Sequence, residues 1–158
     1  MIPSPSVGHL IWQVALKWRL AMDRVLAEHG LTSAQYGVLA SLHALSRSGD
    51  LPTQRELADF SGVEPMSVSK LARGLERRGL VRRTQHPSDT RAVELELTSH
   101  GAELVTRAAG TVRALHDRLL QPLGGLEGSR TSSLVDVMQR LLDHAAAEND
   151  AHDPRRAR

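Results

Sequence analysis

The segment from Thr53 to Phe60 and the one that follows it constrain the fold of this chain more than any other feature. Thr53 and Glu56 have the spacing of a capping box, in which each side chain accepts a backbone N–H of the first turn, and they predict a helix ending near Phe60. Residues 61–63, Ser-Gly-Val, suit a tight turn. Pro65 suits the first position of a second helix, where its missing N–H costs nothing.

The second helix is followed by a two-stranded ribbon. Arg77 and Arg78 fall in its last turn, where cations interact favourably with the helix dipole, and Gly79 ends it. Residues 81–84 and 92–97 are predicted to be strands, and a turn-rich tip, QHPSDT, lies between them. The second strand alternates apolar with acidic residues, the pattern of a half-buried strand. The sequence therefore predicts a helix-turn-helix with a wing, whose second helix can lie in a DNA major groove.

The second helix has one apolar face and one polar face. The face expected to enter the core carries Val68, Leu71, Ala72 and Leu75. The opposite face, at i, i+4, i+7 and i+11 spacing, carries Met66, Lys70, Arg73 and Arg77, with Ser67 and Ser69 near its start. Long cations reach guanine edges or phosphates, and short hydroxyls permit close approach. A solvated helix face is the alternative interpretation, but the position inside a capped helix-turn-helix favours DNA.

The ribbon tip offers a second DNA contact. Arg91 lies just past the tip, and Asp89 stands two residues before it. A narrow minor groove concentrates negative potential and attracts arginine. Asp89 is expected to hold the side chain of Arg91, or that of Arg83, in position; the alternative is a surface ion pair worth less than about 1 kcal/mol. Residues 64–91 together hold seven Lys/Arg against three Asp/Glu, the charge pattern of a phosphate-binding surface.

Composition excludes several classes of function. The chain has no cysteine, which rules out disulfides, thiolate nucleophiles, thiol redox control and cysteine zinc sites. The sequence has no long apolar run, so we expect no membrane span and no signal peptide. The expected location is the cytoplasm.

Enzyme chemistry is not expected, and neither is a cofactor. No Ser-His-Asp arrangement, nucleophile elbow or paired carboxylates occur in a credible context. His144, Glu148 and His152 have the i, i+4, i+8 spacing of ligands on one helical face, but they fall near the end of the chain. We therefore predict no metal site and keep this cluster as the alternative.

Long helices are expected on either side of the winged segment. A second capping box, Thr32 with Gln35, starts a helix to about Ser46. Thr98 is placed to cap a helix with Leu104, Ala108, Val112, Leu115 and Leu119 on one face. The expected organisation is a flexible N-terminus at 1–8, a helical dimerisation region at 9–29 and 99–147 (with a break at 122–128), a winged helix-turn-helix lobe at 30–98, and a disordered basic tail at 148–158. The broad apolar faces of residues 11–26 and 134–142 are too large for one small domain to leave in water, which predicts a homodimer.

Three stretches resemble the MarR family (multiple antibiotic resistance regulators) in register: LTSAQYGVLASL, QRELADFSGVEPMSVSKLARGLERRGLVRR and PSDTRAVELELTSHG. The most specific piece is the Asp-x-Arg of the wing followed by Leu97, Thr98 and Gly101, and the resemblance covers about residues 9–145. It implies a mainly α fold with a small β-wing, a winged helix-turn-helix whose N- and C-terminal helices intertwine in a homodimer on double-stranded DNA, and repression as the default. The implied DNA-binding residues are Gln54, Met66, Ser67, Ser69, Lys70, Arg73, Arg77, Arg83, Asp89 and Arg91.

Two further implications come with the resemblance. Glu64 and Pro65 stand where the family usually has Ser/Thr and a polar residue, and an acidic side chain there opposes a phosphate contact. Family members bind small aromatic or lipophilic acids in a cleft, which by analogy is lined here by Trp12, Trp18, Arg19, Tyr36 and His43. The alternatives are that the tryptophans belong to the dimer core, and that the chain is a protein-interaction module that kept the fold but lost DNA binding.

Overall fold

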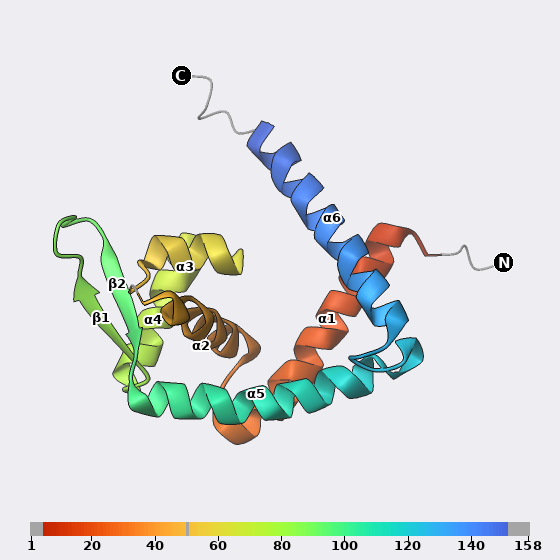
Figure 1. Ribbon diagram of the computed structural model, residues 1–158, viewed down its shortest axis with the longest axis horizontal. Helices are drawn as coiled ribbons and strands as arrows, with labels where there is room; N and C mark the ends of the chain where they lie inside the picture. The colour runs from red at the N-terminus through yellow and green to blue at the C-terminus, as the bar shows by residue number, and fades with distance from the viewer. Residues whose placement is uncertain (1–4, 50, 152–158) are drawn as a thin grey trace. The chain divides into compact units, whose positions relative to one another are not determined.

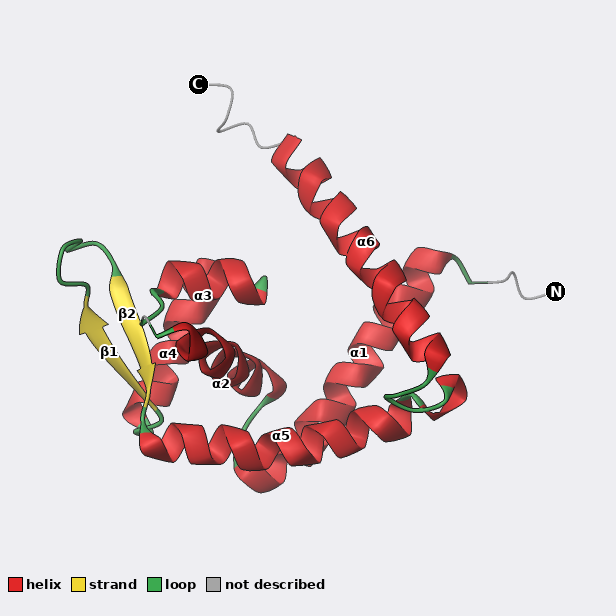
Figure 2. Cartoon of the chain, in the orientation of Figure 1, coloured by secondary structure: helices red, strands yellow, loops and turns green. Residues whose placement is uncertain are grey.

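The computed structural model describes residues 5–49 and 51–151, which form six α-helices, three 3-10 turns and one two-stranded sheet (Figures 1 and 2). This confirms the mainly α fold with a small β-wing. The chain divides into two compact units, with the division after Leu115. The first unit holds the helix-turn-helix and the wing, and the second holds the C-terminal helix.

Helix α1 spans Val7–Leu26 and continues as a 3-10 turn over Ala27–His29. It begins two residues before the expected start, so residues 7 and 8 of the expected flexible N-terminus are helical. The reason is Ser6, whose hydroxyl accepts the N–H of His9 at 3.3 Å and caps the first turn. Gly30 ends the turn with a φ of +63°, in the left-handed region that glycine adopts without strain.

The two capping boxes predicted from sequence are both present. Helix α2 spans Ser33–Leu45 after the Thr32 box, and α3 spans Gln54–Ser61 after the Thr53 box. A 3-10 turn over Ser46–Ser48 occupies part of the expected loop between them. Gly62 then turns the chain with a φ of +66°. Helix α4 spans Pro65–Arg77 with proline in its first turn, as predicted.

The wing consists of β1, Val81–Gln85, and β2, Val93–Leu97, paired antiparallel so that Val81 faces Leu97 and Gln85 faces Val93. Leu95 at the centre of β2 is fully buried, and its N–H donates to the carbonyl of Pro52 at 2.8 Å. A β-bridge between Thr53 and Glu94 lies beside that bond. The wing is therefore attached through its backbone to the start of α3.

The core of the first unit is aliphatic and draws on every helix and strand of that unit. Its fully buried large side chains are Leu26, Val38, Leu39, Leu42, Leu57, Val68, Leu75, Leu80 and Leu95. Burying one such side chain contributes about 1.5–3 kcal/mol. Because these residues come from α1 to α4, from β2 and from the residue just before β1, the core holds the helix-turn-helix and the wing as one body.

Helix α5 spans Ser99–Leu119, with Thr98 at its start. The Thr98 hydroxyl accepts the N–H of Gly101 at 3.0 Å and donates to the carbonyl of Gly79 at 2.7 Å, so the cap also fixes the end of the turn after α4. The predicted inner face is buried at Leu104, Ala108, Val112 and Leu115. Leu119, expected on that face, is 37% exposed because it lies beyond the end of the core.

The second unit contains a 3-10 turn over Gln121–Leu123 and helix α6 over Ser129–Ala151. The hydroxyl of Thr131, a buried polar residue, donates to the carbonyl of Gly125 at 2.6 Å and closes the turn before α6. The predicted end of α6 at Ala147 was wrong, since the helix runs four residues further into the expected disordered tail. Alanine and glutamate favour helix there, and the sequence has no glycine or proline between Ala147 and Pro154. Residues 152–158 of that tail lie outside the described residues.

Helices α1 and α6 each carry several large apolar residues that are exposed to solvent. Those of α1 are Val7, Leu10, Ile11, Trp12, Val14, Leu16 and Leu20, and those of α6 are Leu134, Val135, Val137, Met138, Leu141 and Leu142. Among the described residues, no helix has the length and hydropathy needed to cross a membrane.

Gly101 and Gly110 of α5 provide a matched test of this packing. A Cβ at Gly101 would overlap the carbonyl oxygen of Leu80, which is held by the N–H of Thr98 at 3.1 Å. We expect Gly101→Ala to lower the free energy of unfolding by about 1–3 kcal/mol, because the overlap forces a backbone shift. Gly110→Ala meets nothing within 4 Å and should raise it by up to about 1 kcal/mol. Urea denaturation of both variants measures this; equal midpoints would contradict the packing described.

Candidate nucleic-acid interface

Helix α4 packs against α2, α3 and β1 (Figure 1). One of its faces is exposed to solvent. Val68, Ala72 and Leu75 are fully buried, as predicted, and Leu71 is half-buried. The polar face lies outward: Met66, Ser67, Lys70, Arg73 and Arg77 are exposed and Ser69 is half-buried. The predicted division of this helix into a core face and a polar face is therefore confirmed.

Glu64 forms the N-terminal cap of α4. Its carboxylate accepts the backbone N–H of Ser67 at 2.9 Å, and Pro65 follows in the first turn. A carboxylate at this end also interacts favourably with the helix dipole. The acidic residue therefore helps to start the helix at Pro65, and it leaves the next turns of the polar face unobstructed.

Asp89 organises the backbone of the wing tip. Its Oδ1 accepts the backbone N–H of Arg91 at 2.9 Å, which corrects the expectation that it would hold a guanidinium. A short carboxylate reaches an amide two residues ahead more easily than it reaches a long side chain. Arg83, the other expected partner, instead bonds Glu76 of α4 at 3.3 Å and is only 21% exposed at its side chain. That bond joins β1 to α4.

His86 is a wing residue that the sequence analysis missed. Its Nδ1 accepts the backbone N–H groups of Ser88 and Asp89 at 3.3 and 3.2 Å. An imidazole that accepts at Nδ1 carries its proton at Nε2, which lies 3.6 Å from a Glu94 carboxylate oxygen. The only signal in the sequence is a histidine directly before Pro-Ser-Asp. Together with Asp89, His86 fixes the turn that presents the exposed Arg91.

The first turn of α3 carries another of the expected DNA-binding residues. Gln54, its first residue, is half-buried beside the Thr53–Glu56 capping box. The hydrogen bond from the Thr53 backbone N–H holds the pKa of the Glu56 carboxyl below its ordinary value. The cap is therefore complete at neutral pH and weakens only as the carboxylate takes up a proton in acid.

Among the residues expected to bind a small effector, three are exposed and two are half-buried. Trp12 is 62% exposed and stacks on His9 with ring centroids 6.1 Å apart. Arg19, which lies 4.0 Å from Asp23, and His43 are also exposed. Trp18 and Tyr36 are half-buried and pack against the core, and burial raises the pKa of the Tyr36 phenol.

The alternative metal cluster is only partly visible. His144 and Glu148 lie on α6, and His152 is outside the described residues. Within the described part of the chain, no three or more potential metal ligands lie together.

Comparison with known proteins places these features in a family. The profile of the MarR family matches residues 31–93. The HTH-type transcriptional regulator YdcH of Bacillus subtilis (strain 168) is 33% identical over 142 residues, which cover 90% of this chain and 93% of that protein. The matched profile spans α2, the helix-turn-helix and the wing up to the start of β2.

Two solved structures share the fold. The transcriptional repressor CouR, bound to a 23-mer DNA duplex, is 30% identical with a TM-score of 0.71, and the match covers 89% of this chain and 92% of that one. The PcaV transcriptional regulator from Streptomyces coelicolor, in complex with its natural ligand, is 25% identical with a TM-score of 0.78, and the match covers 92% and 99%.

Proposed function

The chain belongs to the MarR family of DNA-binding transcriptional regulators, and from this premise we propose that it is a repressor that binds a pseudo-palindromic operator as a homodimer. The observation that carries the proposal is the outward polar face of α4, held in place by its buried apolar face. A recognition helix needs such a face to enter the major groove. CouR, a repressor bound to a DNA duplex, supports the same reading.

The roles of the side chains follow from where they lie. In this proposal Arg73, Ser69 and Met66 of α4 contact base edges, and Arg91 of the wing tip enters the minor groove; the exposure of Arg73, Met66 and Arg91 supports these roles. Gln54 lies at the start of α3, where phosphates are commonly bound. The whole proposed DNA-binding set is Gln54, Met66, Ser67, Ser69, Lys70, Arg73, Arg77, Arg83, Asp89 and Arg91. Within it, Arg83 and Asp89 act by shaping the wing.

Arg73→Ala and Arg91→Ala should separate base reading from groove sensing. We expect Arg73→Ala to weaken operator binding by about 1–3 kcal/mol and to relax preference at one base pair. Arg91→Ala should weaken binding and reduce the preference for A·T-rich flanks, because a narrow groove is what this side chain senses. The measurement is fluorescence anisotropy against a library of duplexes, with Arg107→Gln on α5 as control. Variants indistinguishable from wild type would support the interaction-module alternative.

Homodimer formation is argued from the exposed apolar residues of α1 and α6. Leu134, Val137, Met138 and Leu141 follow i, i+3, i+4, i+7 spacing, a stripe that a monomer would leave in water.

Light scattering should give a mass of twice the 17.3 kDa of the chain. Leu141→Lys should shift the protein to monomer, because it places a charge in the stripe. Gln139→Lys on the same helix should leave the dimer intact, since Gln139 lies beside Asp143 at 2.9 Å outside the stripe. A folded wild-type monomer would contradict this part of the proposal.

Control by a small aromatic or lipophilic acid is the last part of the proposal. PcaV was solved with its natural ligand, and in this chain Trp12, Trp18, Arg19, Tyr36 and His43 are the proposed contacts. A ligand that prefers one spacing of the two recognition helices lowers DNA affinity, and DNA must lower ligand affinity by the same factor.

The two tryptophans make this coupling measurable by fluorescence. A panel of aromatic acids and phenols should contain a compound that changes the emission and weakens operator binding, and Trp12→Phe and Trp18→Phe tell which ring reports it. If no compound changes the emission or operator binding while a divalent metal changes operator binding, the effector proposal fails. The cluster that contains His144 then becomes the candidate metal site.

A further inference from the structure

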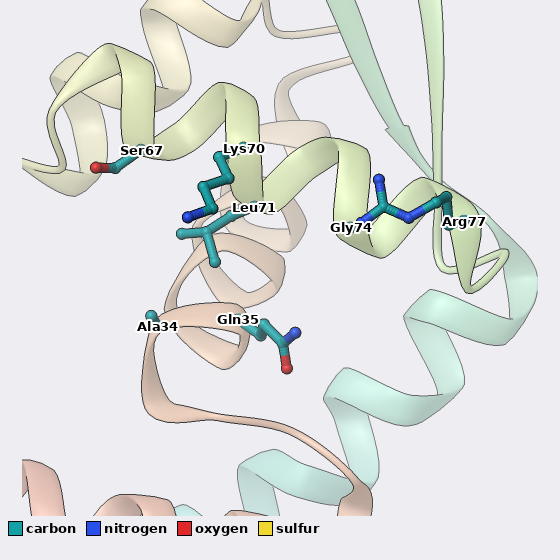
Figure 3. A pocket seen from close by; sticks show the side chains of 7 residues that line it. All are labelled: Ala34, Gln35, Ser67, Lys70, Leu71, Gly74 and Arg77. Carbon is teal, nitrogen blue, oxygen red and sulfur yellow. The ribbon is translucent and has the colours of Figure 1, made fainter.

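The flank of α4 that faces α2 forms one wall of an open hollow of about 430 Å³ (Figure 3). Helix α4 contributes Ser67, Lys70, Gly74 and Arg77, and the first turn of α2 contributes Gln35. Figure 3 shows the two cationic side chains along the same helix, above the start of α2. The hollow therefore lies beside the helix proposed to enter the major groove.

The lining has the chemistry of an anion site. It holds two cations, a hydroxyl and an amide beside the apolar side chains of Ala34 and Leu71, and no carboxylate. Lys70 and Arg77 are exposed, and neither makes a salt bridge with any residue in the described ranges 5–49 and 51–151. Both charges are thus available to a ligand.

The Gln35 amide adds a donor whose orientation is fixed. Its Oε1 accepts the backbone N–H of Thr32 at 3.1 Å in the capping box. Because an acceptor must face that N–H, the NH₂ group lies on the other side of the amide. In Figure 3 the Gln35 nitrogen is turned to the side of α4.

Gly74 keeps the wall of the hollow open. A Cβ there would meet only a nitrogen of the Arg77 guanidinium, at an ordinary contact distance of 3.8 Å. Internal packing therefore does not require glycine, although glycine in mid-helix costs about 1 kcal/mol relative to alanine. Glycine at this position leaves room for a ligand to approach the helix backbone.

The opposite flank of α4 differs in charge. It carries Glu76, which bonds Arg83 of the wing at 3.3 Å. An α-helix with its side chains is about 10–12 Å across, and the major groove is about 12 Å wide, so the flanks of a recognition helix face the two phosphate walls. The flank toward α2 offers a phosphate two cations that make no salt bridge among the described residues, and these cations lie beside a hollow.

We propose that the hollow between α2 and α4 seats a backbone phosphate of duplex DNA. Lys70 and Arg77 contact its oxygens, Ser67 and Gln35 donate hydrogen bonds to them, and Gly74 leaves room for the sugar-phosphate chain. The inference rests on the proposed DNA-binding function and deepens it: it assigns Lys70 and Arg77 to backbone positioning and leaves Arg73 to discriminate between bases.

Salt dependence distinguishes these roles. The probes are a duplex selected by the wild type from a random library and one unrelated duplex of equal length. Lys70→Gln and Arg77→Gln should each reduce the slope of log K against log salt by about 0.9 and weaken binding to both duplexes by the same factor. Arg107→Gln on α5, which also removes one positive charge, should leave slope and affinity unchanged. Variants that keep the wild-type slope, or that change which bases are preferred, would overturn the inference.

Gly74 supplies an independent test that does not remove a cation. Gly74→Gln and Gly74→Glu have nearly the same size, and neither residue disfavours helix. Gly74→Glu should bind both duplexes at least tenfold more weakly than Gly74→Gln, because a carboxylate then occupies the seat, and circular dichroism should show both variants folded. Equal binding by the two variants would overturn the inference while the proposed function stands. Failure of the wild type to bind any duplex would overturn the proposed function as well.

Discussion

Burial of one face of α4 is the constraint on which the rest of the structure depends. Val68, Ala72 and Leu75 are fully buried against α2, α3 and β1, and they fix the rotation of the helix about its axis. A rotation of one residue position, about 100°, would bring charge into an aliphatic core, which is strongly unfavourable. The same three apolar residues therefore decide that Lys70, Arg73 and Arg77 face outward.

The wing is tied to this helix at two points. Through its backbone, Leu95 of β2 bonds Pro52 just before α3, and through its side chain Arg83 of β1 bonds Glu76 of α4. The distance between the recognition helix and the wing is therefore fixed by these two bonds and by the shared core, and not by a flexible hinge. The tip is organised separately, by His86 and Asp89, which bond backbone amides on either side of the turn. This separation lets the tip present Arg91 without disturbing the core.

Much of this arrangement was predictable because local rules determine it. Capping boxes at Thr32 and Thr53 act within four residues, so their sequence spacing was enough to place α2 and α3. The helix after Pro65 followed from its end signals, and its buried face followed from periodicity.

What was missed depends on contacts that spacing does not encode. Ser6 extends α1 by capping it, and α6 continues because no residue stops it at Ala147. Whether the Asp89 carboxylate bonds a side chain or a backbone amide depends on the conformation of the folded turn. The hollow beside Gly74 requires α2 and α4 to lie together, although the two helices are separated in the sequence by α3.

Hydroxyl-radical footprinting on a selected duplex tests the central claim most directly, namely that two copies of this chain place two recognition helices in successive major grooves. The account predicts two protected regions related by a pseudo-twofold axis, with centres about 10 base pairs apart or a multiple of that spacing. A single asymmetric protected region, or protection of single-stranded but not of duplex DNA, would contradict it.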